Sequence, residues 1–198
     1  MADVIRVIIV DDESLVRAAL RVFLESADGF ELVGEADNGA DAVTLVRAVK
    51  PDVVLMDVQM PTMDGIEATR RLTQEFPGIK VVALTTFSAE RVIVPMLSAG
   101  ASGYLVKDTS PDRILDAARL AHEGGYVLSP RVAKELISSV QTGDAGTPRS
   151  LGRDEELTDR ELEVVTLLAQ GMSNAEIAAA MFVSEATVKS HLGRITAK

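Results

Sequence analysis

The sequence predicts two parts of different fold class, an α/β domain followed by a small all-α domain. In residues 1–127, short apolar runs alternate with amphipathic helical segments, which is typical of an open parallel sheet with helices on both faces. From residue 157 onward the pattern is helical only. Residues 128–156 contain a stretch of Gly, Pro and small polar residues, which predicts a linker between the two parts.

Five apolar runs in the first part predict five strands. Several are rich in Val and Ile and apolar almost throughout, as expected for strands that are buried on both faces. They are Ile5–Val10, Phe30–Ala36, Val53–Met56, Lys80–Leu84 and Gly103–Val106. The segments between and after them carry apolar stripes at helical spacing, such as Leu15, Val22 and Phe23, and predict five helices.

The fourth of these helices is expected to be short. Pro95 lies inside the segment Ala89–Ala99, where this helix should form. Proline is tolerated in the first turn of a helix but costs about 3 kcal/mol in its interior. We therefore predict a short helix, or one that begins near Val94 and Pro95.

The later segments are helical as well. Residues 128–140 predict a short helix, with Ser129 as its N-cap and Pro130 in its first turn. Farther on, Thr158 and Glu161 have the spacing of a capping box that opens a helix. Helices are also expected after Ser173 and after Ser184.

Only two or three residues around Phe182 separate the last two helices, and this is the spacing of a helix-turn-helix. Within the last helix, Val188, Leu192 and Ile195 recur at helical spacing, so we assign them to the core.

Composition excludes several chemistries. The chain has no Cys, so disulfides, thiolate metal sites and a Cys nucleophile are ruled out. Two distant histidines argue against a His-rich metal site, and the absence of Trp argues against an aromatic platform for stacking bases. No apolar run reaches the length of about 18 residues that a membrane span needs, and no signal peptide is visible, so we expect a cytoplasmic protein.

Polar side chains follow four of the predicted strands at the point where each strand ends. They are Asp11 and Asp12, Asp57, Thr85, and Lys107. In an open parallel sheet these ends lie along one edge, where functional groups collect. Three carboxylates there would repel one another without a cation, and oxygen ligands with room for water suit Mg²⁺. A Lys and a Thr beside them suit a phosphoryl group.

Asp57 is the candidate for the reacting carboxylate, because it stands alone at the tip of its strand. A carboxylate beside Mg²⁺ can attack a phosphoryl group and form an aspartyl phosphate. A single Asp after a strand is more often a cap or a turn former. The joint occurrence of Asp, Thr and Lys at successive strand ends is what favours the phosphoryl site.

These motifs resemble the receiver domain of bacterial two-component response regulators of the NarL/FixJ type. The resemblance spans residues 4–125 and is carried by Val10–Glu13, Met56–Gly65, Leu84–Thr86 and Ala99–Asp108. It implies a flavodoxin-like sheet with strand order 2-1-3-4-5. It also implies that a sensor histidine kinase phosphorylates Asp57, and that phosphorylation controls homodimerisation and transcription.

The same resemblance assigns roles to the other residues of the site. Asp11, Asp12, Asp57 and the backbone carbonyl of Gln59 would hold Mg²⁺, and Lys107 would contact the phosphoryl group. Thr85 and Tyr104 would form a switch pair. A phosphoryl group adds roughly two negative charges and three acceptor oxygens, so the Thr hydroxyl is drawn toward it and the Tyr ring can fill the vacated space.

Residues 157–198 resemble the LuxR-type DNA-binding domain through Leu157–Val164, Gly171–Ala178 and Val183–Ile195. The resemblance implies that the last predicted helix lies in the major groove of double-stranded DNA. The candidate DNA contacts are Ser184, Thr187, Lys189, Ser190, Arg194 and Lys198. His191 stays open between core packing and a phosphate contact. The family domain has a fourth helix that usually begins soon after Ala197, so we expect these 198 residues to lack it and to bind DNA weakly.

Two other functions remain as alternatives. A phosphatase of the haloacid dehalogenase type also uses a nucleophilic Asp, Mg²⁺ and Lys, but it expects a second Asp where this chain has Gln59. A pure interaction module is the other alternative. We expect no enzyme activity beyond self-phosphorylation from small phosphodonors and slow autodephosphorylation.

The net charge of −10 is unevenly distributed along the chain. Residues 1–127 hold 12 basic and 20 acidic residues, while residues 151–198 hold 5 and 8. From Ser184 onward, Lys189, Arg194 and Lys198 stand against Glu185 alone. The local charge therefore permits contact with DNA, although the average for the whole chain argues against it.

Overall fold

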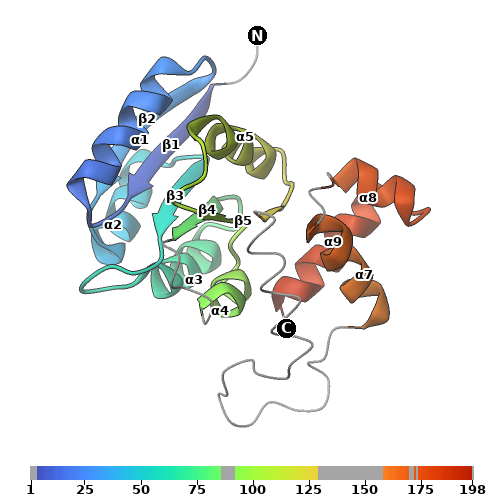
Figure 1. Ribbon diagram of the computed structural model, residues 1–198. Helices are drawn as coiled ribbons and strands as arrows, with labels where there is room; N and C mark the ends of the chain where they lie inside the picture. Colours follow the sequence, from blue (N-terminus) through green and yellow to red (C-terminus); the bar gives the residue numbers. More distant parts are fainter. Residues whose placement is uncertain (1–3, 86–91, 129–157, 170–171, 173, 198) are drawn as a thin grey trace.

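Parallel strands in the order β2-β1-β3-β4-β5-β6 form the sheet of the N-terminal part in the computed structural model (Figure 1). The structure describes residues 4–85, 92–128, 158–169, 172 and 174–197. The strands are β1 (Ile5–Val10), β2 (Phe30–Ala36), β3 (Val53–Asp57), β4 (Lys80–Thr85), β5 (Gly103–Val106) and β6 (Val127–Leu128). The predicted order of the first five strands is confirmed. The sixth was not predicted, because two residues are too short to show an alternating pattern.

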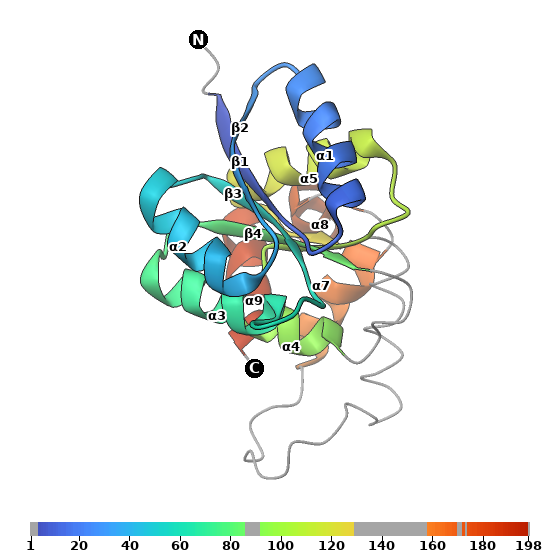
Figure 2. The same cartoon turned by 90° about the vertical axis from the view of Figure 1, so that its left-hand side faces the viewer.

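Helices cover both faces of this sheet. They are α1 (Ser14–Ser26), α2 (Gly39–Val49), α3 (Gly65–Glu75), α4 (Ile93–Ser98) and α5 (Pro111–His122). Successive strand residues point to opposite faces. Val7 and Ile9 therefore pack with α1 and α5, whereas Ile8 and Val10 pack with α2, α3 and α4. Figure 2 shows these two helical layers, which confirm the doubly wound architecture.

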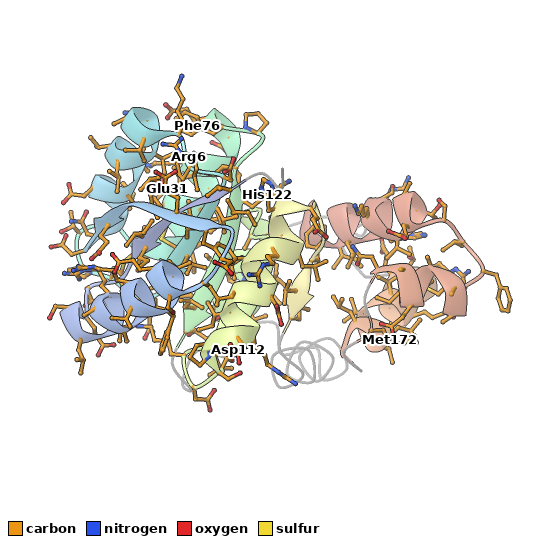
Figure 3. The ribbon with its side chains drawn as sticks, turned by 90° about the horizontal axis from the view of Figure 1, so that it is seen from above. Arg6, Glu31, Phe76, Asp112, His122 and Met172 are labelled. Carbon is orange, nitrogen blue, oxygen red and sulfur yellow. The ribbon has the colours of Figure 1, made fainter. Side chains whose placement is uncertain are left out.

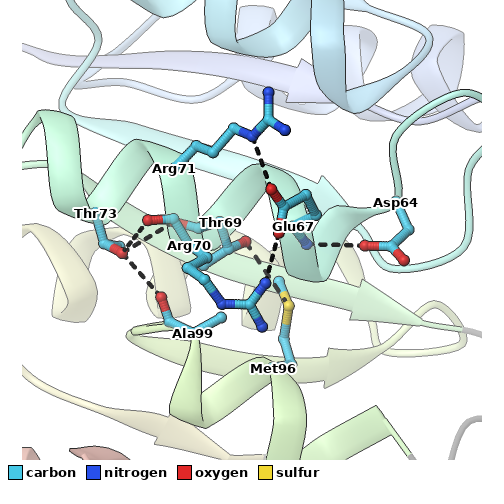
Figure 4. Close-up of polar contacts among 8 residues, drawn as sticks. All are labelled: Asp64, Glu67, Thr69, Arg70, Arg71, Thr73, Met96 and Ala99. Carbon is cyan, nitrogen blue, oxygen red and sulfur yellow. Dashed lines mark hydrogen bonds and ion pairs between the residues drawn. The ribbon is translucent and has the colours of Figure 1, made fainter.

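Helix α4 is short, as Pro95 predicts. It has six residues, and the proline is the third of them, within the first turn, where a missing N–H removes no helical hydrogen bond. Neighbouring α3 holds it in place: the Thr73 hydroxyl donates to the Ala99 carbonyl at 2.8 Å, and the Thr69 hydroxyl lies 3.7 Å from the sulfur of Met96 (Figure 4).

The C-terminal helices are α7 (Asp159–Ala169), α8 (Asn174–Ala180) and α9 (Glu185–Ala197). The capping box at the start of α7 is confirmed, because the Thr158 amide donates to Glu161 Oε2 at 2.8 Å and the Glu161 amide to Thr158 Oγ1 at 3.3 Å. Val188 and Leu192 are buried in the core between these helices, as predicted. Ile195 is partly buried.

The two parts pack against each other through α4, α7 and α9 (Figures 1 and 2). Val165 of α7 is buried in the same apolar cluster as Met96 and Leu97 of α4, and Ile195 of α9 packs against that cluster. A small apolar pocket lies at this contact. Its lining residues are Leu97, Ser102, Tyr126, Leu128, Val165, Leu168, Leu192 and Ile195.

Seen from above, the C-terminal helices, with Met172, lie at the β6 edge of the sheet (Figure 3). Arg6 and Glu31 belong to β1 and β2 near the opposite edge, where their side chains form an ion pair of 3.8 Å. Leu128, at the start of the helix expected at residues 128–140, belongs to β6, and residues 129–157, Ser173 and Lys198 lie outside the described residues. No helix in the described part of the chain is long and apolar enough to cross a membrane.

Candidate functional site

An acidic cluster lies at the carboxyl edge of the sheet. Asp11 and Asp12 follow β1, and Asp57 is the last residue of β3. One carboxylate oxygen from each residue lies within 4.8 Å of the others. Asp11 and Asp57 are buried, whereas Asp12 is exposed to solvent. Hard oxygen donors that face solvent on one side are the ligand set that Mg²⁺ takes, so these residues fit the ion that the sequence predicts.

Lys107 supplies the positive charge of this cluster. Its Nζ lies 2.8 Å from Asp11 Oδ2, 3.3 Å from Asp57 Oδ2 and 3.3 Å from Glu13 Oε1. Burial opposes the charged ammonium, but the bonds with Asp11 and Asp57 outweigh it and raise the pKa of Lys107. Lys107 is therefore a permanent cation at neutral pH, able to pair with an incoming anion.

Asp57 is a buried carboxylate whose environment favours the protonated form. Its side chain accepts a hydrogen bond of 2.8 Å from the Val58 amide, and the residue is 4% exposed. Burial raises the pKa of Asp57 to about 6, Lys107 acts in the lowering direction, and the charge of Asp11 adds to the rise. Neutralising charge, from a metal ion above all, therefore favours the ionised and nucleophilic form of this residue.

The strand ends bring Thr85 and Gln59 to the same edge, whereas Tyr104 lies two residues before the end of β5. Thr85 is the buried last residue of β4, and its carbonyl accepts a hydrogen bond of 2.7 Å from the Lys107 amide. Tyr104 lies in β5, with its side chain fully buried in the core on the α4 side of the sheet. Gln59 follows β3 by two residues and is exposed.

Glu13 is a site residue that sequence reasoning missed. Its carboxylate lies 3.3 Å from the ammonium of Lys107, and its backbone amide donates to Asp11 Oδ1 at 2.9 Å. The only signal in the sequence is its place directly after the Asp pair. Acidic residues at a helix start are common, so this signal alone does not distinguish a site residue from a favourable charge near the helix N-terminus.

The predicted DNA contacts within the described residues lie on α9 and on the turn before it. Ser184, Ser190 and Arg194 are exposed, whereas Thr187 and Lys189 are half-buried. The Thr187 amide donates to Ser184 Oγ at 3.1 Å, so Ser184 caps the start of α9.

Lys189 of α9 contacts the N-terminal part. The Nζ of Lys189 lies 3.4 Å from the carbonyl oxygen of Glu123, at the end of α5, so this candidate DNA contact faces the N-terminal part. His191, whose role the sequence left open, is half-buried.

A doubly wound sheet with an acidic cluster and a lysine at its carboxyl edge, joined to a helix-turn-helix, defines a receiver domain coupled to a DNA-binding domain. Residues 7–119 match the model of the response regulator receiver domain, and residues 155–198 match that of the bacterial regulatory proteins of the luxR family. The chain belongs to the two-component response regulators that carry a LuxR-type DNA-binding domain.

Its relatives include transcriptional regulators of Bacillus subtilis. The chain is 39% identical to the uncharacterized transcriptional regulatory protein YhcZ over 193 residues, which are 98% of this chain and 88% of that protein. It is 39% identical to the transcriptional regulatory protein LiaR over 195 residues, covering 98% and 90%.

A solved structure, the response regulator ChrA of a heme-sensing two-component system, is 39% identical with a TM-score of 0.61 and covers 98% of this chain and 89% of that one. Together these matches confirm a transcriptional response regulator.

Proposed function

We propose that Asp57 is the phosphoacceptor and that a sensor histidine kinase is its phosphodonor. The observation that carries this proposal is the contact of a buried strand-end carboxylate with Lys107 inside an acidic cluster. A carboxylate serving only as a helix cap would not need a buried cation beside it. Membership of the two-component response regulators, which work with sensor kinases, supports the choice of donor.

The proposed reaction transfers a phosphoryl group from the donor to a carboxylate oxygen of Asp57. A carboxylate oxygen of Asp57 attacks the phosphorus atom, and the bond from phosphorus to the donor breaks, with its electron pair leaving on the donor. The ammonium of Lys107 pairs with a phosphoryl oxygen. Asp11, Asp12, Asp57 and the Gln59 carbonyl would hold Mg²⁺, which supplies positive charge against the phosphoryl oxygens.

Phosphorylation would then reach the DNA-binding domain through Thr85, Tyr104 and α4. The Thr85 hydroxyl donates to the phosphoryl group, and the ring of Tyr104 moves into the space that it leaves. Tyr104 packs in the cluster that contains Met96 and Leu97 of α4, which α9 and α7 contact. A change in this cluster would loosen the contact with α9, so that the DNA-contacting residues of α9 become available and the chain pairs as a homodimer on double-stranded DNA.

The test is to incubate the protein with Mg²⁺ and acetyl phosphate and to follow its intact mass and its molar mass in solution. We expect one acid-labile phosphate per chain, a shift toward the dimer, and no labelling of the Asp57→Asn variant. Labelling of that variant would refute the assignment. Sustained turnover of the phosphodonor would instead indicate a phosphatase.

A further inference from the structure

We propose that Glu13 is a positioning residue that holds Lys107 at the rim of the acidic cluster and competes with the phosphoryl group for it. This inference rests on the proposed phosphoacceptor function of Asp57 and adds a control on that same site. The carboxylate of Glu13 would then help to determine how tightly the site binds an anion.

The ammonium of Lys107 can bind several acceptors at once. A lysine ammonium has three protons to donate. Three carboxylate oxygens surround Nζ of Lys107, at 2.8 Å from Asp11, 3.3 Å from Glu13 and 3.3 Å from Asp57. The contact with Glu13 is a hydrogen bond and the contacts with Asp11 and Asp57 are ion pairs, so the three carboxylates share the positive charge of Lys107. An incoming phosphoryl oxygen therefore competes with these carboxylates for the ammonium, and Glu13 is the outermost of them, with a side chain that is 58% exposed.

Backbone hydrogen bonds hold both Glu13 and Lys107 in place. The Glu13 amide donates to Asp11 Oδ1 at 2.9 Å, and its carbonyl accepts the first hydrogen bond of α1, from the Arg17 amide at 3.1 Å. The Lys107 amide is bound to the Thr85 carbonyl at 2.7 Å. The start of α1 therefore fixes the backbone of Glu13, and the end of the sheet fixes the backbone of Lys107. Their side chains contact each other from these fixed positions.

The side chain of Glu13 does not cap α1. The residue occupies the N-cap position of α1, yet its side chain makes no capping hydrogen bond there. Ser, Thr, Asp and Asn are the residues that cap a helix well. The chain therefore has a poor capping residue at this position, and its carboxylate is directed to Lys107 instead.

The charge of Glu13 acts in opposite directions on the two ligands of the site. A fourth carboxylate beside Asp11, Asp12 and Asp57 attracts a divalent cation and repels an anion. Removal of this charge should therefore weaken Mg²⁺ binding and strengthen the binding of a phosphoryl group. Exposed ion pairs are weak, so we expect changes of roughly two- to five-fold in each affinity.

The experiment uses the full chain and beryllofluoride as the stand-in for the phosphoryl group, with both affinities measured by titration calorimetry. For Glu13→Gln at saturating Mg²⁺, we expect beryllofluoride to bind two- to five-fold more tightly and acetyl phosphate to label faster by a similar factor. In a separate Mg²⁺ titration, the same variant should bind the metal more weakly. General destabilisation would weaken the binding of both ligands, so it would not produce two effects of opposite sign.

Two further variants separate the ion pair from net charge. Glu25→Gln removes the same charge from the exposed far end of α1, about 18 Å along the helix, and should change neither affinity. Glu13→Asp keeps the charge but shortens its reach, so it should strengthen beryllofluoride binding while leaving the Mg²⁺ affinity nearer to that of the parent protein.

The proposal is overturned if Glu13→Gln leaves the beryllofluoride affinity unchanged or weakens it at saturating Mg²⁺. This outcome is distinct from failure of the proposed phosphoacceptor. In the latter case the parent protein and its Asp57→Asn variant would behave alike toward acetyl phosphate, whatever residue stands at position 13.

Discussion

At the scale of single residues, the site contains a carboxylate that is costly to keep ionised. Asp57 is buried, and its pKa is raised from 3.8 to about 6 mainly by burial. Lys107 offsets this cost only in part, because it is shared with Asp11 and lies closer to that residue than to Asp57. Asp57, the phosphoacceptor that we propose, is therefore held in a state that a bound metal ion would relieve, and this would connect phosphoryl chemistry to the stability of the fold.

The first prediction concerns the pH dependence of stability without metal. Since the folded-state pKa of Asp57 lies above 3.8, the folded protein binds more protons than the unfolded chain between pH 3.8 and about 6, and its stability falls as the pH rises through this window. Asp57→Asn removes the buried charge. At pH 8 this substitution should raise the free energy of unfolding by roughly 2–3 kcal/mol relative to the parent protein. Below about pH 4 the two proteins should be equally stable.

Denaturant titrations of both proteins in a chelator, at several pH values, measure this difference. Addition of Mg²⁺ at pH 8 should stabilise the parent protein far more than the variant. Equal stability of the two proteins at all pH values would contradict the raised pKa of Asp57.

At the scale of elements, the turn from β3 into α3 requires a glycine for steric reasons. A Cβ on Gly65 would overlap the backbone carbonyl oxygen of Asp57, and the Gly65 amide donates to the Val58 carbonyl at 3.0 Å. Ala in a helix is normally about 1 kcal/mol more favourable than Gly. Here Gly65→Ala should instead lower the free energy of unfolding by roughly 1–3 kcal/mol and slow labelling by acetyl phosphate, because the Asp57 backbone must shift.

Gly78→Ala is the matched control, since a Cβ at that position meets no atom within 4 Å. Its stability and labelling rate should stay close to those of the parent. Equal behaviour of the two variants would show that the close approach at Gly65 is not what shapes the turn.

A second element carries local strain in the turn of the helix-turn-helix. Phe182 has φ 55 and is 96% exposed, and the amides of Phe182 and Val183 donate to the carbonyls of Ala179 and Ala178. This is a Schellman ending of α8, in which glycine is preferred at the left-handed position. Phe182→Gly should therefore stabilise the C-terminal helices by up to about 1 kcal/mol.

Hydrogen exchange of the α8 and α9 amides measures the effect of this change. Ser190→Gly places the same residue at an exposed position within α9 and should lower protection there by roughly 0.5–1 kcal/mol. A loss of protection in the Phe182→Gly variant would mean that the aromatic ring contributes more than its exposure suggests.

Elements with a local signal were predictable from the sequence. The continuous run of Val and Ile in Val7–Val10 predicts a strand that is buried on both faces, Pro95 shortens α4, and Thr158 with Glu161 opens α7 through contacts only three residues apart. Strand β6 and the position of Glu13 had no such signal. The first depends on pairing with β5 across more than 20 residues of sequence, and the second on a side chain that reaches Lys107 from a distant strand end.

At the scale of the whole molecule, the proposed function requires the interface between the two domains to link the state of the site to the state of α9. Leu128 of β6 packs against the apolar cluster beneath α4 and against the core of the C-terminal helices, whereas its neighbour Val127 packs against the cluster beneath α1 and α5. Adjacent residues of one short strand thus contact different parts of the molecule. A coupling between two sites needs an element that contacts both parts, and Leu128 makes such contacts.

Leu128→Ala should therefore free the C-terminal helices, while Val127→Ala should not. Loss of a half-buried apolar side chain costs roughly 1–2 kcal/mol, and in Leu128→Ala part of this loss falls on the contact between the domains. We expect faster hydrogen exchange in α9 and tighter DNA binding by the unphosphorylated protein, with β1 still protected. For Val127→Ala we expect a small loss of stability in the N-terminal domain and unchanged exchange in α9. If both variants raise exchange in α9 equally, the docking of α9 depends on the overall stability of the N-terminal domain rather than on the Leu128 contact.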